Sequence, residues 1–119
     1  MVPALLLFAA ATCAQPWSAI DVARTLERQG VGREWKAVPQ PPEAERRMAM
    51  SKPSRAIVMT FGCQGDYLDE LAAEDREIAD GDKLIRFQND GALALVVFYR
   101  PVTAAEGAVT RATLANLTP

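Results

Sequence analysis

Histidine is absent from this chain of 119 residues. Because histidine is the commonest general base and the commonest metal ligand, its absence excludes a Ser-His-Asp site and every histidine-ligated metal centre. A phosphate-binding glycine loop is also missing, since Gly62 and Gly65 are not followed by Lys and Ser or Thr. The net charge is only −2, from 13 basic and 15 acidic residues. We therefore expect no nucleic-acid partner.

Long apolar runs are scarce, and the longest begins the chain at residues 4–11. Thr12, Cys13 and Ala14 follow it, and then Gln15 and Pro16. An apolar run that ends in small residues is typical of a cleavable export signal, and residues 12 and 14 predict cleavage after Ala14. The run is shorter than the ~20 residues that span a bilayer, so we expect no transmembrane span in the mature chain. This segment predicts a periplasmic or secreted protein.

Two features of the same segment leave alternatives open. No Lys or Arg precedes the apolar run, although export signals normally begin with one. Either the true start lies upstream of Met1, or the run is a buried N-terminal helix or strand of a cytosolic protein. Cys13 also follows small residues, which makes lipidation at Cys13, and hence a lipid-anchored protein, the lesser alternative.

Residues 15–119 predict a single α+β domain, and a chain of this length can bury a core without metal or disulfide support. Ser18 and Thr103 begin capping-box patterns, and Asn89-Asp90-Gly91 is a strong hairpin signal. We expect a small mixed sheet of about three to four strands, with a hairpin near 83–99, packed by about three helices. The helices are expected at 18–30, 66–80 and 103–117, and the strands at 34–38, 55–61, 83–88 and 92–99.

Two segments of this domain carry more specific expectations. Residues 39–54 contain four prolines, which predicts a long connection. The helix near 66–80 is expected to have one apolar side, formed by Leu68, Leu71, Ala72, Ile78 and Ala79.

Cys63 is the residue that comes closest to a catalytic candidate. It lies between a predicted buried strand and the first turn of a predicted helix, where the helix dipole and free backbone N–H groups stabilise a thiolate. If Cys13 is removed with the signal, Cys63 is unpaired and is either reactive or joined to another molecule. If Cys13 is retained unmodified, a Cys13–Cys63 bridge can form, which conflicts with export.

Sulfur-containing side chains are the best candidates for a metal site in this sequence. Met48 and Met50, with Cys63, offer soft ligands that suit Cu(I). Methionine more often fills gaps in a core than it binds metal, so we expect no metal and no cofactor.

Charge is distributed unevenly along the chain. Eight acids and Arg76 alone lie between residues 66 and 82, whereas eight bases and four acids lie between residues 24 and 55. Such blocks are usually solvated faces, and here they either attract each other within the fold or form a docking surface for another protein. Trp17 and Trp35 are expected in the core, with a partner interface as the alternative.

Together these patterns predict a small exported accessory or binding protein without catalytic activity, which contacts another protein through a polar, charged surface. The alternative is a thiol-dependent redox or soft-metal-binding protein centred on Cys63.

Overall fold

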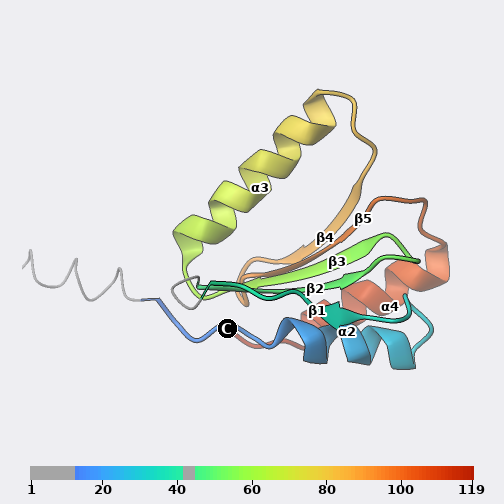
Figure 1. The fold of residues 1–119 in the computed structure, drawn as a ribbon, viewed down its shortest axis with the longest axis horizontal. Helices are drawn as coiled ribbons and strands as arrows, with labels where there is room; N and C mark the ends of the chain where they lie inside the picture. Colours follow the sequence, from blue (N-terminus) through green and yellow to red (C-terminus); the bar gives the residue numbers. More distant parts are fainter. Residues whose placement is uncertain (1–12, 42–44) are drawn as a thin grey trace, which may run out of the picture.

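The structure is a computed structural model that describes residues 13–41 and 45–119 (Figure 1). The described part forms an α+β fold with three helices, as the sequence predicted, and five strands. The helices are α2 (Ala19–Arg28), α3 (Gln64–Ala79) and α4 (Ala104–Ala115). The strands are β1 (Lys36–Ala37), β2 (Arg46–Ser51), β3 (Ala56–Phe61), β4 (Ile85–Asn89) and β5 (Ala94–Phe98).

The strands form one sheet in the order β1-β2-β3-β5-β4, and every neighbouring pair is antiparallel. The predicted strand–helix–strand unit is present, because β3 and β4 both run antiparallel to β5 and therefore parallel to each other. They are not neighbours, however. The hairpin after Asn89 places β5 between them, and β5 is buried at all five positions. The sheet is therefore antiparallel throughout and not mixed.

Strand β2 lies inside residues 39–54, which the sequence predicted to be a connection. Its sequence, Arg-Arg-Met-Ala-Met-Ser, is a weak β pattern. It becomes a strand because β3 offers it a partner at six positions, including Met48 opposite Met59. Tertiary pairing thus overrides local propensity here. Residues 42–44 lie outside the described part.

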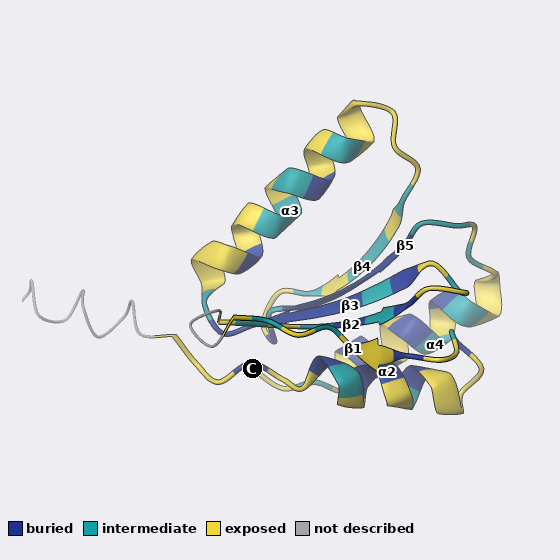
Figure 2. Ribbon diagram, in the orientation of Figure 1, coloured by how far each residue is buried: buried dark blue, intermediate teal, exposed yellow. Residues whose placement is uncertain are grey.

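Helices α2 and α4 cover one face of the sheet (Figures 1 and 2). Leu26 of α2 and Leu114 of α4 pack in a core with Val58, Val96 and Phe98 of the sheet. The Ser18 hydroxyl caps α2 by accepting the N–H of Asp21 at 3.4 Å. At α4, Thr103 and Glu106 form both bonds of a capping box, each 3.1 Å long. The sequence predicted both caps, and they are confirmed.

Helix α3 crosses the other face of the sheet and diverges from it toward its C-terminal end (Figure 1). Its sheet-facing stripe holds Tyr67, Leu71 and Ile78 at helical spacing, together with Glu70, Glu74 and Glu77. Only Tyr67 and Glu74 are buried, whereas Leu68 and Ile78 are 51% and 48% exposed (Figure 2). The predicted apolar side of this helix is therefore wrong. Three carboxyl groups on the inner stripe disfavour flat packing on an apolar sheet.

No helix among residues 13–41 and 45–119 is both long enough and apolar enough to cross a membrane.

Candidate functional site

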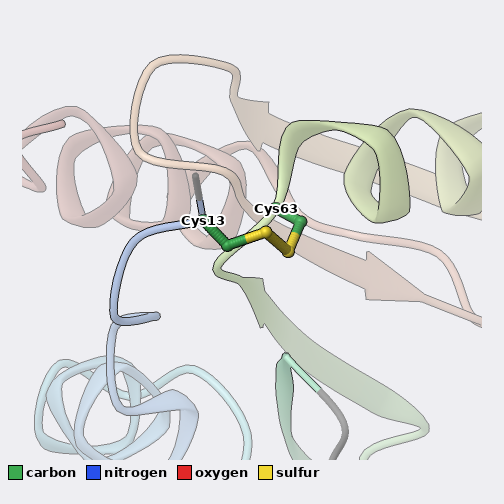
Figure 3. The surroundings of a disulfide bond; sticks show 2 residues. All are labelled: Cys13 and Cys63. Carbon is green, nitrogen blue, oxygen red and sulfur yellow. A yellow bond between two sulfur atoms is a disulfide. The ribbon is translucent and has the colours of Figure 1, made fainter. Parts of the chain in front are cut away.

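A disulfide joins Cys13 to Cys63 across 50 residues of chain, with the two Cα atoms 4.6 Å apart (Figure 3). Cys63 follows β3 and is the N-cap residue of α3, whereas Cys13 lies in the segment that leads into α2. The sequence left the state of both cysteines open. In the structure, the two cysteines are joined by a disulfide.

The segment that carries Cys13 is attached to the domain by further bonds. The N–H of Ala14 donates to the carbonyl oxygen of Gly62 at 2.8 Å, and the Thr60 hydroxyl donates to the carbonyl oxygen of Trp17 at 2.5 Å. A Cβ atom at Gly62 would collide with the carbonyl oxygen of Ala14, so glycine is what permits this close approach. The indole N–H of Trp17 in turn donates to the carbonyl oxygen of Thr118 at 2.9 Å. Residues 13–17 are thus an integral part of the fold.

Residues 1–12 of the predicted signal lie outside the described residues. Cleavage after Ala14 would remove Cys13, and lipidation would occupy its sulfur atom. Each of these events therefore excludes the disulfide. Nothing in the described residues tests whether either occurs, so cleavage at Ala14 and lipidation at Cys13 stay predictions.

The disulfide changes what Cys63 can do chemically. It has the position expected from the sequence, at the N-terminus of α3, and its side chain makes no capping hydrogen bond. As a disulfide its sulfur atom is neither a nucleophile nor a thiolate ligand. Thiol chemistry at Cys63 would first require reduction of the bridge.

The predicted sulfur ligands Met48 and Met50 lie on β2, whereas Cys63 precedes α3. Met48 lies opposite Met59 on adjacent strands, and both pack with Phe61 and Leu95 in the apolar cluster beneath α3. Met50 pairs with Ile57, farther from the Cys63 end of β3. Within the described residues, no three His, Cys, Asp or Glu side chains are grouped so that they could hold a metal ion. Met48 and Met59 contribute to the packing of this apolar cluster.

A polar cluster beneath α3 was not predicted from the sequence. Arg86 of β4 reaches up to α3, where its Nη1 donates to Glu74 Oε1 and to the carbonyl oxygen of Leu71, both at 3.2 Å. Its Nη2 lies 3.2 Å from Asp75 Oδ1, and its Nε donates to Gln88 Oε1 at 2.9 Å. Arg86 is thus the polar connection between the sheet and the middle of α3.

Tyr67 makes a second polar connection, near the N-terminal end of α3. Its hydroxyl donates to Asp90 Oδ1 at 2.5 Å, and Gln88 Nε2 donates to the same oxygen at 2.7 Å. These two bonds lower the pKa of Asp90. Burial, followed by the bond to Asp90, raises the pKa of Tyr67. The Tyr67 hydroxyl is therefore a fixed donor at neutral pH.

Glu74 is the most unusual group of the cluster, because its side chain is only 1% exposed. Burial and a side-chain hydrogen bond with Glu70 together raise its pKa to about 8, against the opposing effect of Arg86. Glu74 and Arg86 are twelve residues apart, and neither belongs to a recognisable motif. The signal available in the sequence was the helical spacing of Tyr67, Glu70, Leu71 and Glu74, which marks a polar inner stripe.

The acidic block is divided between the two sides of α3. Its three glutamates lie on the sheet-facing stripe, whereas Asp66, Asp69 and Asp75 are exposed. Arg86, which makes ion pairs with Glu74 and Asp75, belongs to neither charge block. We call the exposed side of α3, with Asp66, Leu68, Asp69, Ala72, Arg76 and Ala79, the outer face of α3.

The two tryptophans have different environments. Trp35 is buried in the core, and its indole N–H donates to the carbonyl oxygen of Val31 at 3.3 Å. Trp17 is 39% exposed at a groove between α2 and α4. The prediction of core packing is therefore confirmed for Trp35 and wrong for Trp17.

A second, larger groove of about 860 Å³ lies at the end of the sheet toward which α3 ends, between residues 82–85 and 99–101. Arg100 lines it, but its guanidinium group is held by Glu106 at 2.9 and 3.0 Å and by the carbonyl oxygen of Ser54 at 2.6 Å. The ion pair between Arg100 and Glu106 therefore stabilises the start of α4.

Comparisons of the chain with family models, with curated proteins and with solved structures found no match.

Proposed function

We propose that this protein is an exported, non-catalytic binding protein that contacts a partner protein through the outer face of α3. The observation that carries the proposal is the composition of this face, where exposed aspartates surround a half-exposed leucine. A polar rim around an apolar contact is the usual arrangement of a protein interface. The fold also positions this helix away from the sheet, with its outer face accessible to a partner (Figure 2).

Export is supported by the disulfide together with the apolar run of the sequence. Disulfides persist in oxidising compartments such as the periplasm and the extracellular space, and they are rare in the cytosol. The bridge requires Cys13 in the mature chain. We propose that signal cleavage lies N-terminal to Cys13, and not after Ala14 as the sequence predicts, in a periplasmic or secreted protein.

The partner is expected to present a basic surface with an apolar patch. Asp66 and Asp69 attract cations, whereas Leu68 and Ala72 supply apolar contact area. The same carboxylates repel phosphate groups, which disfavours a nucleic acid at this face.

The alternative function is thiol-dependent redox or soft-metal chemistry at Cys63. It is favoured by the position of Cys63 at the N-terminus of α3, where a thiolate is stabilised once the bridge is reduced. In the reduced protein, a Cys63 thiol pKa at or above the model value of about 8.5, with no stabilisation by Cu(I), would rule this function out.

Intact-mass measurement tests the export proposal. Protein expressed with its native start should give a mature species that begins upstream of Cys13, with a mass two hydrogens below that of the reduced form. The disulfide supplies the physical reason, since both sulfur atoms must be retained to form it. A chain that begins at Gln15, or one with a lipid on Cys13, would contradict this form of the proposal.

Peptide binding tests the docking face. A synthetic amphipathic helix of Lys and Leu should bind more tightly than its Glu and Leu counterpart, and 1 M salt should weaken the binding because it screens exposed charges. Substituting Leu68→Ser together with Asp69→Asn should weaken it about tenfold, through lost apolar contact and a lost ion pair. Fluorescence anisotropy of labelled peptides measures these affinities.

The control for the docking face is Glu27→Gln, which removes one charge from the exposed side of α2 on the opposite face of the sheet. It should leave the affinity unchanged. Equal affinity for the two peptides, or equal loss in both variants, would show that α3 is not the docking face.

A further inference from the structure

We propose that Glu74 and Glu70 share one proton beneath α3 and that this proton holds the helix against the sheet. When the proton is lost, α3 is released. The inference goes beyond the proposed function, and its test involves no partner.

The two oxygen atoms of the Glu74 carboxyl group have different environments. Oε1 accepts a hydrogen bond from Arg86. Oε2 is closed to solvent and has no hydrogen-bond partner among the described residues when the carboxyl group is taken as ionised. A buried acceptor without a partner costs about 1–3 kcal/mol, and more when it is charged. An ionised Glu74 is therefore poorly accommodated.

A proton on Oε2 removes this cost, because the atom then becomes a donor. We assign the acceptor to the carboxyl group of Glu70, which lies one helical turn earlier and whose interaction with Glu74 raises the pKa of Glu74. A proton shared between the two carboxyl groups thus accounts for both the unpartnered Oε2 of Glu74 and the neighbouring carboxylate of Glu70.

Charge balance supports the same arrangement. With one shared proton, Glu70, Glu74 and Asp75 carry two negative charges beside the positive charge of Arg86, whereas without it they carry three. Without the proton, two negative charges face each other where one of them is fully buried. Like charges at such a site disfavour double ionisation. The relief available to the protein is to move α3 away from the sheet, so that Glu74 reaches water.

The other groups around Glu74 keep their charge state near neutral pH. From α3, Tyr67 has a raised pKa, and beyond β5 the same is true of Tyr99, which is half-buried near the glutamates of α3. From the β4–β5 turn, Asp90 has a lowered pKa. Arg86 and Gln88 are the polar groups of β4 at this place, and Asp75 pairs with Arg86 from the same helix.

Few other groups in the described part of the chain respond to pH between pH 6 and 9. The sequence has no histidine, and both cysteines are held in the disulfide. A pH response of α3 between pH 6 and 9 is therefore assigned to Glu74.

The direction of the response follows from linkage. The pKa of Glu74 is about 8 when α3 is docked and returns toward the ordinary glutamate value of 4.5 when the helix is released. The proton therefore stabilises the docked helix fully below pH 4.5, and this contribution is lost as pH rises to 8. The opening equilibrium constant of α3 should rise up to about tenfold per pH unit over this window and level off above it.

Amide hydrogen exchange of the full disulfide-bonded protein, corrected for intrinsic exchange rates, measures α3 opening between pH 6 and 9.5. In the wild type, the opening constant should rise to pH 8 and then level off. Glu74→Gln keeps the shape and the donor of a protonated glutamate, so its opening constant should not change over this range. The control Glu77→Gln removes a carboxylate from the same side of α3 and should behave like the wild type.

A direct titration completes the test. The ¹³C signal of the Glu74 carboxyl group should move with a midpoint near pH 8 in the wild type and at a lower pH in Glu70→Gln, where the like charge is gone. A midpoint near 4.5, a wild-type opening constant that does not depend on pH, or the wild-type rise retained in Glu74→Gln would each overturn the proposal.

Discussion

Replacing Cys13 with Ala is expected to lower the free energy of unfolding by about 4 kcal/mol, which is roughly a thousandfold in the unfolding constant. The bridge spans 50 residues of chain, and a loop of this length greatly restricts the unfolded ensemble. The bridge also holds residues 13–17 where Ala14 and Trp17 bond to Gly62 and Thr60. Urea unfolding of the oxidised wild type and of the variant measures the difference.

The matched controls use the other cysteine. Cys63→Ala and the double variant should each lose as much stability as Cys13→Ala, since all three remove the same bridge. Reduced wild-type protein should approach the same stability. A loss below about 1 kcal/mol, or additive losses in the double variant, would contradict a bridge between these two residues.

Arg86→Met is expected to lower the free energy of unfolding by about 3 kcal/mol. The substitution leaves the buried Glu74 without its cation, and breaking one partner of a buried pair costs about 3–5 kcal/mol. It also removes the donors to Leu71 and Asp75, which connect the sheet with α3. Hydrogen exchange should show the loss of protection mainly in α3.

Arg76→Met is the matched control, because Arg76 is exposed on α3 and makes no ion pair with another described residue. It should change stability by no more than about 0.5 kcal/mol. Equal effects of the two substitutions, or an Arg86→Met variant with wild-type protection in α3, would show that the Arg86 connection does not hold the helix.

Local signals in the sequence predicted much of the fold correctly. The caps at Ser18 and Thr103 and the turn around Asp90 depend on bonds between residues three positions apart. These interactions form within one turn of chain, so their pattern can be recognised without knowledge of the rest of the molecule.

Strand β2 and the inner stripe of α3 were missed for a common reason. Arg46 and Arg47 begin a strand because β3 pairs with them, and nothing in the local pattern requires it. Glu74 lies on the inner side of α3 because Arg86 meets it there. Glu74 and Arg86 are 12 residues apart, and Arg46 and Arg47 pair with Phe61 and Thr60 across the turn between β2 and β3. Neither set of partners can be identified from the local residue pattern.

The cysteines show where local information ends. Their number, their spacing and the apolar run before Cys13 can be taken from the chain itself, and these features limit the outcome to removal, lipidation or pairing. Pairing was decided by the tertiary structure, which brings the end of β3 against residues 13–17 and places the two Cα atoms 4.6 Å apart. A disulfide depends on distance in space, and a separation of 50 residues along the chain carries no information about that distance.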